Sequence, residues 1–186
     1  MFILTTSALG AFGQAKTAPE ISISKCWAYA AVEAGIALSS DSTRVFIGAD
    51  GARVDTLSMD GKKIWSTELG GDLSSNLLPT EKGLLLATST EGPASERPTS
   101  VLRSLSKETG ITNWTIKLPS AERFFLGLHN GVVIVVAKSG TIQAVDPVDG
   151  SVRWKRDLAD GFAAEPVFSN TKVIVAAKAN QIFSVS

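Results

Sequence analysis

Short apolar runs recur along the chain, separated by segments in which every second residue is apolar. The runs are too short for stable helices, and strict alternation places successive side chains on opposite faces of a strand. Gly, Asp and Pro gather between these segments, as in Asp146–Gly150, where they favour tight turns. The pattern therefore predicts an all-β protein. Four apolar runs mark its most buried strands: Val45–Ile47, Leu84–Leu86, Val132–Val136 and Val173–Val175.

A repeated motif, Gly-x3-Trp-x3-Leu, organises these strands. Trp27 precedes the first tryptophan of the motif by 38 residues, and the next two intervals are 49 and 40 residues. A period of about 40 residues is typical of propeller blades, each built from four short strands. The three copies of the motif supply these structural repeat residues: Gly61, Trp65 and Leu69; Gly110, Trp114 and Leu118; Gly150, Trp154 and Leu158.

Each repeat predicts four strands, named A to D in chain order. Strand B is the apolar run, strand C is an alternating segment such as Thr141–Val145 or Gln181–Val185, and strand D carries the tryptophan. From Ile21 onward the chain is expected to form a strand D, three complete ABCD blades and a final ABC. Strand A is expected around three segments: Leu73–Leu78, Phe124–Leu128 and Ala163–Phe168.

The Ala-rich segment Ala28–Leu38 is the one competitor to the all-β prediction, because its composition favours a helix. Its distance from the next apolar run matches that of the later repeats. Trp27 precedes Val45 by 18 residues, as Trp114 precedes Val132. We therefore expect a strand here.

An insertion explains the longest interval between tryptophans. Thr88–Ser100 is rich in Pro, Gly, Ser and charge where neighbouring repeats have only a short turn. An insertion confined to one hairpin leaves the blade core unchanged. The segment is either a tolerated surface insertion or a contact loop for a protein partner, with Glu91, Glu96 and Arg97 as candidate contact residues.

The first fifteen residues have the features of an export signal. Residues 1–15 carry no charge, contain an apolar stretch and end in small residues, although no basic residue precedes Lys16. Two interpretations remain: a signal peptide at 1–15 followed by a repeat domain at 16–186, which makes the protein periplasmic or extracellular, or a buried strand. The stretch is too short to cross a bilayer as a helix, and no other transmembrane segment is predicted.

Composition excludes several functions. The chain of 186 residues carries 18 basic and 18 acidic side chains, so its zero net charge gives no electrostatic reason to bind nucleic acid or an anionic membrane. A single cysteine and a single histidine exclude an internal disulfide and most cysteine-rich or histidine-rich metal sites. No catalytic residue, metal or cofactor is expected.

The residues with chemical potential have simpler interpretations. Asp60, Asp146 and Asp149 all lie in predicted turns, where an aspartate side chain bonds to its own backbone. His129 precedes Asn-Gly and is expected to be exposed in a hairpin turn. Cys26 lies next to a repeat tryptophan and is expected to be a small buried hydrophobe.

The repeat resembles the PQQ-like propeller repeat of quinoprotein alcohol dehydrogenases and their non-catalytic relatives. The clearest copy is Val132 to Leu158, and the resemblance covers about residues 21–186. It implies a β-propeller of four-stranded antiparallel blades, about four in number, forming a half-ring or a small closed ring. It also implies that each repeat tryptophan, with Trp27 as the fourth, docks between neighbouring blades near the following turn.

Two functions follow from the resemblance. The first is a non-catalytic scaffold of the cell envelope that binds a protein partner, as expected of the family's propeller subunit in outer-membrane protein assembly. The second is a fragment or subunit of a quinone-dependent dehydrogenase, completed by another chain. The enzymes of the family bind quinone with a divalent cation in a ring of roughly eight blades, and several carry a disulfide between adjacent cysteines, which Cys26 alone cannot form.

Closure of the ring decides the oligomeric state. An open half-ring exposes strand edges at both ends and favours a homodimer or aggregation. A small closed ring requires the segment Ile21–Tyr29 to supply the missing strand D of the last blade. The eight-bladed habit of the family favours the half-ring.

Overall fold

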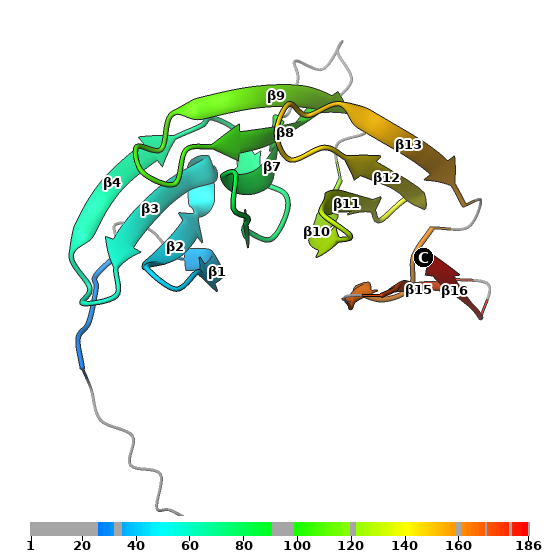
Figure 1. The fold of residues 1–186 in the computed structure, drawn as a ribbon, viewed down its shortest axis with the longest axis horizontal. Coiled ribbons are helices and arrows are strands. Elements are labelled where there is room, and N and C mark those ends of the chain that lie inside the picture. Colours follow the sequence, from blue (N-terminus) through cyan, green and yellow to red (C-terminus); the bar gives the residue numbers. More distant parts are fainter. Residues whose placement is uncertain are drawn as a thin grey trace, which may run out of the picture.

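Four antiparallel sheets follow one another along an open arc in the computed structural model (Figure 1). The structure describes residues 26–31, 35–90, 99–119, 122–158, 161–169, 171–178 and 180–185. The predicted signal peptide, residues 1–15, lies outside these residues. The prediction of an all-β propeller of four-stranded blades is confirmed, and the described residues form an arc that is open at both ends (Figure 1).

Within each blade the strands are antiparallel neighbours in chain order. Strand A lies innermost in the arc and strand D outermost, and β4, β9 and β13 form the outer rim (Figure 1). The first sheet is β1 (Gly35–Ser40), β2 (Arg44–Ala49), β3 (Arg53–Ser58) and β4 (Lys63–Glu68), with a 3-10 turn at Asp50–Ala52. The second is β5 (Asp72–Leu73), β6 (Leu78–Pro79), β7 (Leu84–Thr90), β8 (Thr99–Leu105) and β9 (Thr112–Leu118).

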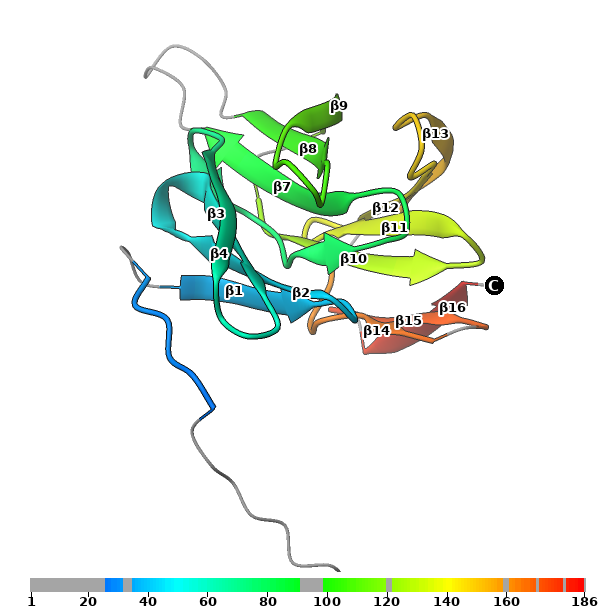
Figure 2. The same cartoon turned by 60° about the vertical axis from the view of Figure 1, so that its left-hand side comes forward.

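The third sheet is complete and the fourth has three described strands. Figure 2, a view turned by 60°, shows the sheets stacked on one another. The third sheet is β10 (Phe124–His129), β11 (Val132–Ala137), β12 (Thr141–Val145) and β13 (Val152–Asp157). The fourth is β14 (Val167–Phe168), β15 (Val173–Ala177) and β16 (Gln181–Val185). The predicted order of three ABCD blades and a final ABC is therefore confirmed.

The hydrophobic core lies between neighbouring sheets. In the inner sheets both faces of strands B and C are covered, because each of these sheets has a neighbour on either side, and this explains why their B strands are continuous apolar runs. Three clusters of buried side chains join the sheets in sequence. They contain, among others, Phe46 and Leu84 between the first and second sheets, Leu102 and Leu126 between the second and third, and Ile142 and Val175 between the third and fourth.

Strand A of the second blade is divided in two. Between β5 and β6 the side chain of Asn76 turns toward the third blade, where its amide donates to Leu126 O at 2.9 Å and its Oδ1 accepts from Leu126 N at 2.8 Å. Ser74 O also accepts from Phe124 N at 2.7 Å. These bonds join the inner strands of two blades, so the break in strand A replaces hydrogen bonds within a sheet by hydrogen bonds between sheets.

The N-terminal segment differs in part from the expected strand. Residues 26–31 have no regular secondary structure, whereas Gly35–Ser40 forms β1. The described part of Ala28–Leu38 contains no helix, so the position within the repeat is a better guide here than alanine content.

Candidate protein-binding surface

Three of the four repeat tryptophans, Trp27, Trp65 and Trp114, dock on the glycine turn of the next blade. Trp65 on β4 donates from Nε1 to Lys107 O at 2.8 Å, and its ring covers Gly110, where an added Cβ would lie 2.6 Å from Trp65 Cε3. Gly110 has φ of +75°, a conformation that favours glycine. The glycine is thus required both by its backbone and by the indole above it, which belongs to the preceding repeat.

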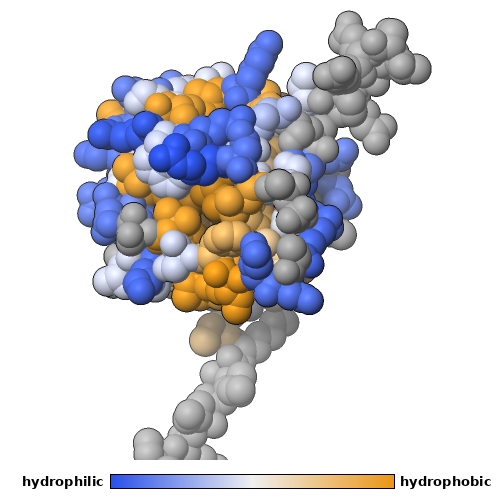
Figure 3. Space-filling model, turned by 90° about the vertical axis from the view of Figure 1, so that its right-hand side faces the viewer, coloured by the Kyte–Doolittle hydropathy of each residue, from blue (hydrophilic) through white to orange (hydrophobic). Residues whose placement is uncertain are grey.

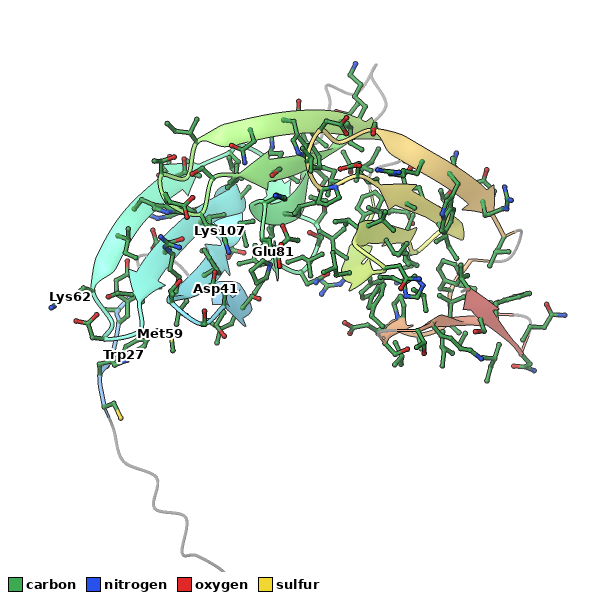
Figure 4. The ribbon with its side chains drawn as sticks, viewed as in Figure 1. Trp27, Asp41, Met59, Lys62, Glu81 and Lys107 are labelled. Carbon is green, nitrogen blue, oxygen red and sulfur yellow. The ribbon has the colours of Figure 1, made fainter. Side chains whose placement is uncertain are left out.

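The same contact recurs at two further positions. Trp114 donates to Pro147 O at 3.1 Å and covers Gly150, and Trp27 donates to Met59 O at 3.0 Å and covers Gly61 (Figure 4). Trp27 therefore takes the place of a strand D tryptophan although residues 26–31 form no strand.

The remaining repeat residues lie in the cores between sheets. Trp154, on β13, packs against the cluster between the third and fourth sheets, and no glycine turn covers it within the described part of the chain. Leu69 packs against the cluster between the first and second sheets, Leu118 is buried in the next one, and Leu158 packs against the last. These side chains hold the blades together.

Two ion pairs join the turns of the first and second blades. Lys107 Nζ lies 2.9 Å from Asp41 Oδ2 (Figure 4). Arg44 Nη1 lies 3.5 Å from Glu108 Oε1. Burial alone would raise the pKa of Asp41, but the Lys107 ammonium and hydrogen bonds from the Thr43 backbone and hydroxyl and the Arg44 backbone outweigh it and hold the pKa well below its ordinary value of 3.8. The aspartate is charged at neutral pH and fixes one turn against the next.

The turns of the second and third blades enclose an open groove of about 350 Å³. Its apolar lining includes Leu128, 45% exposed, and Val148, 63% exposed. Glu81, Lys82 and Asp146 supply charge around them. The turn that carries Val148 also accepts the Trp114 hydrogen bond through Pro147, so the tryptophan contact holds one wall of the groove in place.

The turn aspartates have structural roles. Asp146 Oδ1 accepts from Val148 N, and Asp149 Oδ1 accepts from Ser151 N, both at 2.8 Å. Asp60 accepts a hydrogen bond from the Ser58 hydroxyl and pairs with the Lys62 ammonium, and these contacts lower the pKa of Asp60 to about 2.

A further buried aspartate, Asp55 on β3, lies beneath the N-terminal segment. Tyr29 donates to Asp55 Oδ2 at 3.1 Å, and Arg53 and Lys63 lie within 3.4 Å of Oδ1. Burial would raise the pKa of Asp55, but the hydrogen bonds from Ser66 and Tyr29 and the two cations lower it overall. The carboxylate is charged and ties the N-terminal segment to the first blade.

Two sequence predictions are wrong. His129 is 5% exposed, because β10 continues through it and the turn consists of Asn130 and Gly131, both at positive φ. Its Nδ1 lies 3.3 Å from Ser169 O of the fourth blade, so it joins two blades. Cys26 is exposed, since the N-terminal segment lies on the outside of the first blade rather than inside a sheet.

The residues of the candidate contact loop, Glu91, Glu96 and Arg97, lie outside the described residues. Among the residues that are described, no three His, Cys, Asp or Glu side chains are grouped as a metal site would need. No helix in the same part of the chain is long and apolar enough to cross a membrane. The sequence does not predict the groove or the ion pairs, because their residues come from turns of different blades.

The fold and its tryptophan contacts define an open β-propeller of PQQ-like repeats. A family model described as "Outer membrane protein assembly factor BamB" matches residues 14–120 and 97–186. The chain belongs to this family. No curated protein sequence matches it significantly.

Solved structures share the fold at low identity. BamB from Moraxella catarrhalis aligns with a TM-score of 0.68 and 18% identity over 86% of this chain and 49% of that one. The computationally designed Ika4 protein aligns with a TM-score of 0.62 and 18% identity over 84% and 92% of the two chains. The Neurospora crassa Pan2 WD40 domain aligns with a TM-score of 0.59 and 13% identity over 82% and 46%. The chain therefore spans about half of the Moraxella catarrhalis protein.

Proposed function

We propose that this chain is a non-catalytic propeller scaffold of the cell envelope that binds a protein of the outer-membrane assembly machinery. The observation that carries the proposal is membership of the BamB family. The proposal is further supported by the tryptophan contacts and ion pairs, which fix successive turns against one another.

The groove between the second and third blades is the proposed contact site. An apolar centre with charge around it is the usual composition of a protein interface. Leu128 and Val148 supply the apolar centre, and Glu81 and Lys82 lie beside them. An apolar side chain of the partner would enter between the two turns, and polar groups flanking it would meet the charged residues.

Calorimetric titration with the purified periplasmic part of the outer-membrane assembly machinery from the same organism tests this proposal. The unsubstituted chain should bind, and Val148→Glu or Leu128→Glu should weaken binding at least about tenfold, because a charge in the groove loses the apolar contact. Ile64→Glu is the matched control, since Ile64 is exposed to a similar degree on the outer strand β4. Absence of binding, or equal weakening by the control, would contradict the proposed site.

Export is part of the same proposal. Residues 1–15 are proposed to be a signal peptide, and the mature chain is proposed to begin at Lys16. Cells that produce the full chain should hold it in the periplasmic fraction, with a mass that corresponds to cleavage after Ala15. Recovery of the uncleaved chain in the cytoplasm would contradict export and leave the binding experiment to be judged separately.

A further inference from the structure

The fourth sheet exposes apolar side chains at positions that are buried in every inner sheet. By strand register, Ile182 of β16 is equivalent to Leu102 of β8 and Ile142 of β12. Leu102 is 0% exposed and Ile142 is 1% exposed, whereas Ile182 is 75% exposed. The neighbouring Ile174 is exposed as well. Figure 3, which faces the side where β13 and β16 lie in Figure 1, shows apolar surface across its lower part.

The first sheet has the complementary feature at the other end of the arc. Leu38 of β1 is equivalent by register to Leu126 of β10, and it is 75% exposed where Leu126 is 2% exposed. Together with Tyr29, Val45 and Ile47 it lines an open apolar hollow of about 520 Å³. The inner blades show what fills such a hollow, because there the preceding sheet packs against it.

The two end faces are the two halves of one repeated interface. Between the second and third sheets, Leu102 and Leu126 belong to a single buried cluster. Their equivalents are Ile182 at one end of the arc and Leu38 at the other. These two side chains would therefore meet if the first sheet of one copy followed the fourth sheet of another.

Strand β16 also has the features of a strand that accepts a tryptophan-bearing neighbour. In each complete blade a small residue of strand C pairs with the tryptophan of strand D. The pairs are Thr56 with Trp65, Ser104 with Trp114, and Ala144 with Trp154. Register places Ser184 at this position of β16, because it pairs with Ile174 as Ala144 pairs with Ile134. Within the described residues, no strand pairs with this edge.

The N-terminal segment carries a docked tryptophan but pairs with no strand C among the described residues. Trp27 is docked on the turn at Gly61 as a strand D tryptophan would be. Yet residues 26–31 pair with no strand C among the described residues, and the sheet that would precede the first blade is not part of that region. Among the described residues, Ser184 lies on a strand edge where a tryptophan-bearing strand D could pair, and Trp27 lies on a segment that pairs with no sheet.

We infer that two copies of this chain close head to tail into one ring of eight blades. In each junction, residues 26–31 of one copy add to β16 of the other as its fourth strand, with Trp27 opposite Ser184, and the Leu38 face covers the Ile182 face. Ring closure removes the exposed strand edges, and two equivalent junctions satisfy twofold symmetry. The inference rests on the fold and does not depend on the proposed binding function.

Light scattering on the full chain tests the ring. The unsubstituted protein should have twice the mass of the 19.5 kDa chain. Ile182→Lys or Leu38→Lys should reduce the mass to that of one chain, while circular dichroism keeps its β signal, because both side chains are exposed in a single copy. Ile111→Lys, on an exposed turn away from either end face, should leave the dimer intact. A monomeric unsubstituted chain, a mass above the dimer, or a dimer that survives both end-face substitutions would overturn the inference.

A disulfide tests the strand pairing itself. With Trp27 opposite Ser184 in antiparallel register, Ala30 lies opposite Gln181. In a Cys26→Ser background, Ala30→Cys with Gln181→Cys should form an interchain disulfide that doubles the mass on a non-reducing gel. Ala30→Cys with Ile111→Cys is the control and should not cross-link. An intrachain bond, or no bond, in the first pair would refute the addition of residues 26–31 to β16.

Discussion

The contact between Trp65 and Gly110 joins the first two blades, and the substitution Gly110→Ala tests its importance. An added methyl would lie 2.6 Å from Trp65 Cε3, well inside ordinary contact distance, and φ at Gly110 is +75°. Gly70 is a matched control, because its φ is +73° and an added Cβ meets nothing within 4 Å. Gly70→Ala therefore measures the backbone cost alone, and Gly110→Ala measures that cost plus displacement of the indole.

The magnitudes follow from these two terms. A left-handed conformation costs a residue with a Cβ about 1–2 kcal/mol, so Gly70→Ala should lower the free energy of unfolding by about that amount. Displacing the indole adds about 1–3 kcal/mol for overpacking. It also weakens the hydrogen bond from Trp65 Nε1 to Lys107 O, 2.8 Å long, which contributes about 1 kcal/mol. Gly110→Ala should therefore cost about 3–6 kcal/mol in all.

A double-mutant cycle in urea, followed by circular dichroism at fixed protein concentration, separates these terms. Trp65→Ala alone should cost about 3–5 kcal/mol, as for other large aromatic truncations. In that background the added methyl at Gly110 meets no indole, so Gly110→Ala should cost no more than Gly70→Ala. Equal costs for Gly110→Ala and Gly70→Ala in the unsubstituted chain, or additive costs in the cycle, would refute the interblade contact.

Four further outcomes are expected. Asp41 has a lowered pKa, so its contribution to stability is complete above the ordinary carboxylate pKa and is lost as the pH falls below about 4. Asp41→Asn should therefore lower the free energy of unfolding at neutral pH by about 1–3 kcal/mol and make it less dependent on acid pH. Urea titrations at several pH values will measure both effects. Trp114→Ala should destabilise more than Trp154→Ala in the same assay, because Trp114 has a docked turn in the described structure. His129→Ala should destabilise by about 1–3 kcal/mol, measured by thermal denaturation, since the side chain is buried between blades. Pyrroloquinoline quinone and Ca²⁺ should give neither a bound chromophore in absorbance spectra nor dye-linked alcohol oxidation, and either signal would contradict the non-catalytic proposal.

The sequence predicted the blades well because the information that defines them is local. Strand B is recognisable as a continuous apolar run such as Val132–Val136, and strand D by its tryptophan, whatever lies in other repeats. The turn glycines are equally clear, because a backbone with φ near +75° at Gly110 is one that glycine adopts readily. Even the insertion between β7 and β8 could be placed, since it changes the length of one hairpin and leaves the pairing of Leu86 with Arg103 intact.

The candidate surface could not be predicted in the same way, because it is formed between repeats. Asp41 and Lys107 are 66 residues apart, and neither belongs to the motif. His129 was assigned to a turn because Asn-Gly follows it. Its burial depends on the approach of Ser169 from another blade, which no local pattern encodes. Its position next to a repeat tryptophan predicts that Cys26 is a small buried hydrophobe, but the segment that carries it lies on an outer surface.

The repeat motif gives the arc a direction, and this direction explains why its ends differ. Trp65 and Trp114 each dock on the glycine turn of the blade that follows, and Trp27 docks on the turn of the first blade. Within the described residues no glycine turn covers Trp154. We therefore expect stability to depend on nearest-neighbour contacts, as in other repeat proteins. Within the described residues, Trp27 docks on the turn at Gly61 but pairs with no strand C, and β16 has a small residue, Ser184, at the position that pairs with a tryptophan but has no strand beside it there. The two ends are therefore complementary rather than alike, and a head-to-tail junction satisfies both where a face-to-face junction of identical ends would satisfy neither.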